Sequence, residues 1–412
     1  MEVKNRPVYE RIRGYIRGAC DSSLDWGPGR LQFEDLLDFL SSQECVVDTV
    51  RWWEPETELR GEISKWMLSF SYSYQDRLGR LVWDEQVFDE IYEKFENFLY
   101  SENLIVTSVS PLYLFRCDLT EPIELDMEVG IIPKEHDVNI KCLLNRFETE
   151  GKHFSEDYSW CISARRKFPK SHLKERISDD SKDIAKLEDV LMSLRLLHSG
   201  SVHAGPLCSD EGSPFAGIHG GCRSVFSHSV LKRLPADYII FQLYTLKGGE
   251  IKRLQQIYNQ LASLNHRSQN FLGIPLGRFH DSYERRNERD KLIDLCVALE
   301  SLYVREKDEL AYRLALRCAY FLERDEAKLE ETFRAVRDIY NARSKIVHGT
   351  SGQPNEEQLE KLVTEAEEYV RQSICKLLSD IGYIGKISKK LQEKELHFLD
   401  EVILKKRMRN YL

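Results

Sequence analysis

The feature that most constrains this fold is the helical spacing of apolar residues, repeated from Glu250 onward. Five successive segments carry it: 250–265, 289–304, 308–322, 325–349 and 355–382. In each segment, apolar side chains recur three and four residues apart, which gathers them on one face of a helix. Loop-forming residues in GIPLGRF (273–279) interrupt the series, and the other connections are short. We therefore predict a bundle of antiparallel helices.

The N-terminal part of the chain combines helical and strand patterns. Helical spacing occurs in the first hundred residues, for example in VFDEIYEKFENFLYSEN. Four later segments are rich in β-branched and aromatic residues, which favours strands: 104–119, 128–133, 138–144 and 158–164. A continuous apolar run at 238–244 predicts a further, buried strand.

The predicted fold class is therefore α+β. We expect a mixed α/β domain over 1–180, with a sensor or regulatory role as one interpretation. A connecting region of helix, loop, strand and helix follows over 181–284. An all-α bundle with a basic tail occupies 285–412. Five of the six tryptophans lie in the first hundred residues, where a core is the expected location and a partner-recognition surface is the alternative.

Composition excludes several classes of protein. The net charge is -9, so a surface that is basic throughout, as in many nucleic-acid binders, is excluded, although a local basic site is not. No run of about 18 apolar residues predicts a membrane-spanning helix, and the start has no signal-peptide pattern. Phosphate-loop, dinucleotide-binding and zincin motifs are also missing from the sequence. We expect a cytoplasmic protein whose ten cysteines are mostly buried thiols.

Two stretches have both a binding and a structural interpretation. Residues 165–176 contain six basic side chains, which suit either phosphate contacts or a solvated connection. The loop at 199–223 contains four residues of zinc-ligand types: His203, Cys208, His219 and Cys222. Their spacing matches no standard zinc arrangement, so an ordinary loop and a zinc site both stay open.

The segment 325–349 contains Arg343 and His348, the two residues that indicate most about function. Asp325 is a predicted N-cap, and Gly349 is a predicted C′ residue that ends the helix. The apolar stripe predicted for this helix comprises Leu329, Phe333, Val336, Tyr340 and Val347, with Arg343 at its missing position. A buried arginine needs a partner, and Glu300 in the apolar stretch VALESLYV is the candidate. A purely structural Arg343–Glu300 bridge is one interpretation.

His348 adds a chemical interpretation to Arg343. An imidazole can take and give a proton near neutral pH, and a guanidinium can hold a phosphate through two parallel hydrogen bonds. These groups are sufficient for metal-free RNA cleavage, in which a base activates the 2′-OH and a cation holds the scissile phosphate. The spacing alone is not specific, because Arg223 and His228 repeat it in a Gly-rich stretch. The position of the pair at the end of a capped helix carries the prediction.

Three segments in this order, DKLIDLCVALESLYV, ELAYRLALRCAYFL and FRAVRDIYNARSKIVHG, resemble the Apea-like branch of the HEPN superfamily over about 285–404. The resemblance implies a helical bundle that acts as a metal-independent endoribonuclease without a cofactor. It assigns the catalytic signature to Arg343 and His348, and supporting positions to Glu300 and Ser344. It also implies a homodimer and an antiphage or toxin-like role, with tRNA or mRNA as substrate and a trigger acting at the N-terminal domain.

Arg337 and Lys345 are expected to add positive potential for RNA, because Arg337 lies on the His348 side of the helix. Two other functions stay open. The first is a non-catalytic HEPN module that binds RNA, a nucleotide or a protein, with Arg343 tied to Glu300 and His348 facing away from any cleft. The second is an unrelated helical interaction protein.

Overall fold

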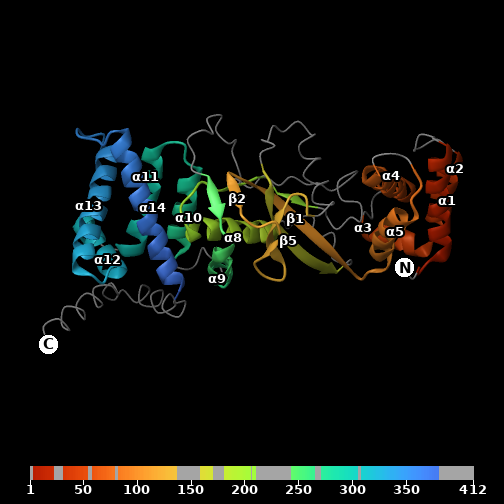
Figure 1. Ribbon diagram of the computed structural model, residues 1–412, viewed down its shortest axis with the longest axis horizontal. Helices are drawn as coiled ribbons and strands as arrows, with labels where there is room; N and C mark the ends of the chain where they lie inside the picture. Colours follow the sequence, from red (N-terminus) through yellow and green to blue (C-terminus); the bar gives the residue numbers. More distant parts are fainter. Residues whose placement is uncertain are drawn as a thin grey trace. The chain divides into compact units, whose positions relative to one another are not determined.

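A computed structural model describes residues 3–22, 31–53, 58–78, 82–136, 158–169, 181–205, 207–209, 243–264, 271–304 and 308–379. These residues form helices and a mixed set of strands (Figure 1). The chain divides into two compact units. The first comprises Met1–Tyr113, Thr120–Leu187 and Ala204–Ser227, and the second comprises Leu114–Leu119, Glu188–His203 and His228–Leu412. Within the described ranges, no helix combines the length and apolarity needed to cross a membrane.

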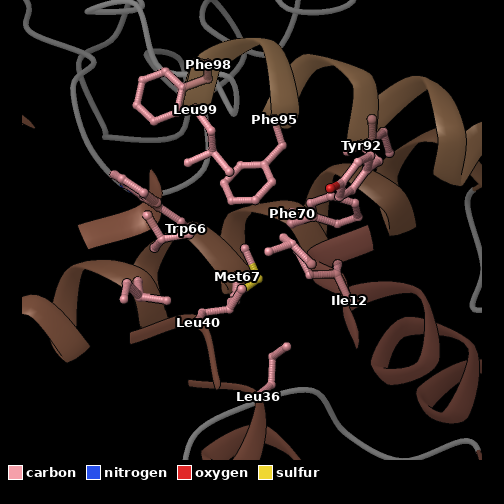
Figure 2. Close-up of a cluster of buried hydrophobic side chains, with 14 of the residues drawn as sticks. Ile12, Leu36, Leu40, Trp66, Met67, Phe70, Tyr92, Phe95, Phe98 and Leu99 are labelled. Carbon is pink, nitrogen blue, oxygen red and sulfur yellow. The ribbon is translucent and has the colours of Figure 1, made fainter. Parts of the chain in front are cut away.

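The first unit begins with five helices: α1 (Arg6–Ser22), α2 (Leu31–Ser41), α3 (Glu44–Trp53), α4 (Leu59–Leu78) and α5 (Glu85–Tyr100). Their apolar faces meet in one aromatic core, in which Trp66, Phe70 and Phe95 pack together (Figure 2). Trp66 is only 4% exposed. The expectation that tryptophans fill a core is therefore confirmed at this position.

An antiparallel sheet follows in the same unit. It contains β1 (Asn103–Tyr113), β3 (Ile123–Glu124), β4 (Val129–Pro133), β5 (Trp160–Pro169), β6 (His203–Ala204) and β7 (Cys208–Ser209). The division between the units falls within β6, after His203. The strand order is β3-β4-β5-β1-β6, and β7 also pairs with β1. Strands predicted near 104, 128 and 158 are thus confirmed, whereas the strand predicted at 138–144 lies outside the described residues. The coarse prediction of a mixed α/β N-terminal region is also confirmed.

The predicted strand at 104–119 is interrupted at Leu114. This residue has a φ of 55°, in the left-handed region, so β1 ends before it and β2 (Phe115–Cys117) begins after it. The two strands belong to different compact units. The chain returns to the first unit at Thr120 and leaves it again between Leu187 and Glu188, inside α8 (Ser181–Leu197). This division lies seven residues after the predicted boundary at 180.

The second unit contains the helical region. Its elements after α8 are β8 (Tyr244–Leu246), η3 (Gly248–Glu250), α9 (Ile251–Ala262), α10 (Gly273–Glu284), α11 (Glu288–Tyr303), α12 (Leu310–Leu322), α13 (Glu326–His348) and α14 (Glu356–Leu378). Helix α11 packs against α10 and α14, and α12 packs against α13 (Figure 1). All five predicted helices are present. No division between units falls at 284, because α9 and α10 belong with α11–α14. The predicted basic tail lies outside the described residues.

The loop predicted at GIPLGRF is wrong, because these residues begin helix α10. Pro275 is the third residue of this helix, where a backbone N–H would have no intrahelical partner. Leu276, Phe279 and His280 then follow at helical spacing and are buried. Packing of this face against α11 stabilises a helix whose Gly and Pro content indicates a loop.

The N-terminus of α13 allows a direct test of local stability. The Asp325 side chain accepts hydrogen bonds from the backbone N–H groups of Ala327 and Lys328 at 3.1 and 3.2 Å, as predicted for an N-cap. Replacing Asp325 with alanine leaves both donors without this partner, and we expect a loss of about 1 kcal/mol in the free energy of unfolding. Urea unfolding measures the change, and Asp325→Asn, which keeps the acceptor, should retain most of the stability.

Candidate functional site

The candidate site lies at the C-terminal end of helix α13. Gly349 has a φ of 63°, and its N–H donates to the Ile346 carbonyl, while the Thr350 N–H donates to that of Lys345. This pair of bonds is the Schellman arrangement, in which a left-handed glycine ends the helix. The predicted cap is confirmed, and His348 is the last helical residue.

The buried face of α13 differs from the predicted stripe. The buried residues are Thr332, Val336, Ile339 and Ala342, and Val347 is 49% exposed. Helix α13 packs against both α11 and α12. Phe333 and Tyr340 lie at the margin of this contact surface, so they are only partly buried. The prediction that Arg343 is a member of the core-facing stripe is therefore wrong. Arg343 lies at the edge of that stripe.

Arg343 is paired with Glu300 of α11, as predicted, but loosely. The distance from its Nη2 to the Glu300 Oε1 is 3.6 Å, which is an ion pair and not a hydrogen bond. The two side chains are 21% and 25% exposed, so the bridge is half-buried. Burial raises the pKa of Glu300, and the neighbouring Arg343 only partly offsets that rise.

The guanidinium of Arg343 retains unused hydrogen-bonding capacity. Its Nε is buried and has no hydrogen-bond partner among the described residues. Its other recorded contact is with the ring of Tyr340, whose centroid lies 5.9 Å from the guanidinium carbon. The terminal nitrogens of this partly exposed side chain could donate to a phosphate, which would satisfy them better than the 3.6 Å contact with Glu300 does.

His348 belongs to a different face of α13. Residues 337, 341, 345 and 348 are all exposed, and spacings of three, four, seven and eleven place them on one stripe of the helix. Arg337 lies 5.7 Å from the ring of Phe333 and has no ion-pair partner among the described residues; nor has Lys345. Ser344, one turn before His348, is half-buried. The stripe thus carries two cations, Arg337 and Lys345, and is a local cationic surface on an acidic protein, with the exposed carboxylate of Asp338 beside it.

Arg343 and His348 do not share a face within one chain. Five residues correspond to a rotation of about 140° and a rise of about 7.5 Å along an α-helix. Arg343 faces α11, where Glu300 lies, whereas His348 projects from the exposed stripe. Both residues are therefore at the end of one helix, but on different sides of it.

A groove runs along the His348 stripe, between α13 and the first half of α14. Its volume is about 480 Å³. It is lined by Ala335, Asp338, Asn341, Ala342, Lys345, Gly352, Pro354, Gln358, Lys361, Leu362 and Glu365. Of the predicted site residues, only Lys345 lines it. Arg337, Arg343, Ser344 and His348 do not.

The sequence did not indicate a buried polar network elsewhere in the second unit. Arg195 of α8 is fully buried and donates to His280 Nδ1 at 3.0 Å and to Glu284 Oε1 at 2.7 Å. Burial alone would raise the pKa of Glu284, but Arg195 and His203 outweigh it and hold that pKa well below its usual range. The sequence signal that could have indicated this network is Arg195 within the apolar sequence VLMSLRLL.

The network continues into α14 through Arg371. This side chain is 5% exposed, donates to the Arg195 carbonyl at 3.0 Å and pairs with Glu367 and Glu368. Tyr283 also donates to Glu367, at 2.7 Å. These charged groups satisfy one another around a cavity of about 260 Å³. We interpret the network as the element that holds α8, α10 and α14 together.

The loop at 199–223, for which an ordinary loop and a zinc site both stayed open, is only partly described. His203 is buried and its Nδ1 lies 3.7 Å from the Glu284 carboxylate, and Cys208 is buried in β7. His219 and Cys222 lie outside the described residues. Among the residues that the structure does describe, no group of three or more His, Cys, Asp or Glu side chains is placed to hold a metal ion.

Comparison with protein-family models finds no match to this chain, and comparisons with curated proteins and with solved structures likewise find none.

Proposed function

We propose that this protein is a metal-independent endoribonuclease whose C-terminal region is a HEPN-type helical bundle. The observation that supports it best is the end of α13, where an exposed His348 follows Arg343, a cation with unused donors. Lys345 and Arg337 extend the positive surface along the helix. A histidine and cations beside solvent suit a polyanionic substrate with a reactive 2′-OH.

The proposed chemistry needs only the substrate and these side chains. His348 removes the proton of the 2′-OH, and the 2′ oxygen attacks the adjacent phosphorus. Arg343 stabilises the charge that develops on the phosphoryl oxygens. The bond from phosphorus to the 5′ oxygen then breaks, and that oxygen takes a proton from an imidazolium. The products are a 2′,3′-cyclic phosphate and a 5′-hydroxyl. DNA lacks the 2′-OH and is not cut.

The different directions of Arg343 and His348 favour a homodimer as the active form. Two copies that meet at their α13 ends would place the histidine of each near the arginine of the other, which one chain alone does not do. Val347, exposed between these residues, would be covered in such an interface. Sedimentation under cleaving conditions tests this proposal, and an active monomer would contradict it.

The substrate class and biological role rest on the resemblance of the C-terminal segments. We propose tRNA or mRNA as substrate, and an antiphage or toxin-like role in which RNA cleavage stops growth. On this proposal the first compact unit receives the trigger.

A second candidate function has its own support. The Arg343–Glu300 contact and the position of His348 outside the described groove fit a non-catalytic HEPN module that binds RNA, a nucleotide or a protein. In that case Glu300 holds Arg343 permanently, and the surface of α13 serves for binding only.

Incubation of the purified chain with total tRNA and mRNA in EDTA distinguishes the endoribonuclease from the non-catalytic binding module. We expect fragments that end in 2′,3′-cyclic phosphate. Glu300→Gln is assayed in parallel, because it removes the charge that holds Arg343 and should raise cleavage if that pair restrains the enzyme. If neither protein produces such ends, the chain is not a nuclease in the absence of its trigger, and the binding module is favoured.

A further inference from the structure

The groove between α13 and α14 has the dimensions of a small-ligand site. Its volume of about 480 Å³ falls within the range of roughly 300–1,000 Å³ for such sites. Apolar side chains of Ala335, Ala342 and Leu362 provide part of its lining, together with the ring of Pro354. Polar and charged side chains provide the rest of the lining. This mixed lining suits a ligand that has both an apolar face and polar edges, such as a nucleotide base.

Several polar groups in the groove have no partner within the described part of the chain. Among the described residues, the carboxylate of Asp338, the amide of Asn341 and the ammonium of Lys345 form no side-chain hydrogen bond or ion pair. The Gln358 carbonyl oxygen accepts from the Asn355 N–H at 3.1 Å, which leaves its amide NH₂ available. The groove thus offers acceptors and donors together, in contrast to the mutually satisfied charges around Arg371.

Lys345 lies at the end of the groove that is closer to His348. Its Nζ is 3.7 Å from the position that a Cβ would occupy on Gly352, a residue with a φ of 76°. Lys361 and Glu365 of α14 also line the groove, but they form an ion pair with each other at 3.8 Å. Asp338 lies two turns away from Lys345 on α13, so the cation and the carboxylate without an ion-pair partner are separated along the groove. A phosphate is therefore favoured at the Lys345 end and disfavoured at the Asp338 end.

The groove is also aligned with His348. On a rise of about 1.5 Å per residue, Lys345 is about 4.5 Å and Asn341 about 10 Å from His348 along the axis of α13. A single-stranded RNA whose phosphate lies at His348 can therefore place its neighbouring nucleotide in the groove.

We propose that this groove binds the nucleotide next to the scissile phosphate of single-stranded RNA, with Lys345 at the backbone and Asp338 and Asn341 at the base edge. This inference rests on the proposed function. A carboxylate accepts hydrogen bonds from an exocyclic amino group, which adenine and cytosine have and uracil lacks. The groove therefore favours adenine or cytosine over uracil at that position.

Binding of fluorescent A7, C7 and U7 oligoribonucleotides tests the inference. The full chain carries His348→Ala, so that the RNA stays intact, and binding is measured by anisotropy in EDTA. We expect A7 and C7 to bind about 5- to 10-fold more tightly than U7. Asp338→Asn should reduce this ratio several-fold, whereas Lys345→Ala should weaken all three about equally, because it contacts phosphate.

The matched control is Glu331→Gln. Glu331 is an exposed carboxylate on the same helix that does not line the groove, so this variant should keep the preference for A7 and C7 over U7. An unchanged ratio in Asp338→Asn, or no binding by any oligonucleotide, would overturn the inference even if the wild type cleaves RNA. If the ratio depends on Asp338 but the wild type produces no cyclic-phosphate ends, the groove assignment stands and the nuclease proposal fails.

Discussion

Replacing His348 with alanine should lower RNA cleavage by about 10²- to 10⁴-fold at pH 7, the usual contribution of a general acid–base group. The variant loses the group that takes the 2′-OH proton, whereas Arg343 and the cationic stripe stay in place. Single-turnover cleavage of a labelled RNA in EDTA measures the chemical step. Because His348 is exposed and is followed by the capping Gly349, the substitution should leave the unfolding transition nearly unchanged.

Two matched variants show whether the loss of RNA cleavage in His348→Ala arises at the end of α13. His136→Ala removes an exposed histidine of the first unit and should leave cleavage unchanged. Arg343→Lys keeps the positive charge but cannot form two parallel hydrogen bonds with a phosphate, so it should retain only part of the rate. Equal cleavage by the wild type and His348→Ala would mean that a contaminant or another site cuts the RNA.

The local features of this site could be predicted from the sequence. Asp325 and Gly349 mark the two ends of α13 because capping depends on side chains and dihedral angles within a few residues. The pairing of Arg343 with Glu300 was also predicted, since an arginine among apolar residues requires a partner.

The orientation of α13 could not be predicted in the same way. Val336 belongs to two apolar stripes in the sequence of this helix. The predicted stripe continues through Phe333 and Tyr340, and the second one through Ile339. Only tertiary packing determines which of them is buried. The structure buries the second stripe and thereby moves Arg343 to its edge. Helix α10 was missed for a related reason, since packing overrides the weak helical propensity of its Gly and Pro residues.

The buried network depends on contacts distant in sequence. Arg195 bonds to Glu284, 89 residues away, and Arg371 bonds to the Arg195 carbonyl, 176 residues away. No local pattern specifies such pairs. A buried arginine indicates that a partner exists, but the sequence does not show which residue it is.

Replacing Glu284 with glutamine should therefore produce the largest loss of stability, about 3 kcal/mol or more in the free energy of unfolding. The variant keeps the shape of the side chain but leaves the fully buried Arg195 without its carboxylate. Removal of one member of a buried ion pair costs more than loss of the pair itself, because an uncompensated charge stays inside the protein. Urea unfolding followed by circular dichroism measures the change.

The pH dependence gives an independent test of the same contact. Since the folded protein holds the pKa of Glu284 below the value of about 4.3 expected for an unfolded chain, its contribution is complete above that pH and is lost as the pH falls further. The difference in stability between the wild type and Glu284→Gln should therefore shrink below about pH 4. Glu330→Gln is the control, because that carboxylate pairs with Arg334 on an exposed surface and should change stability by less than about 1 kcal/mol. If Glu284→Gln were as stable as this control at pH 7, Arg195 would not depend on Glu284 for its charge compensation.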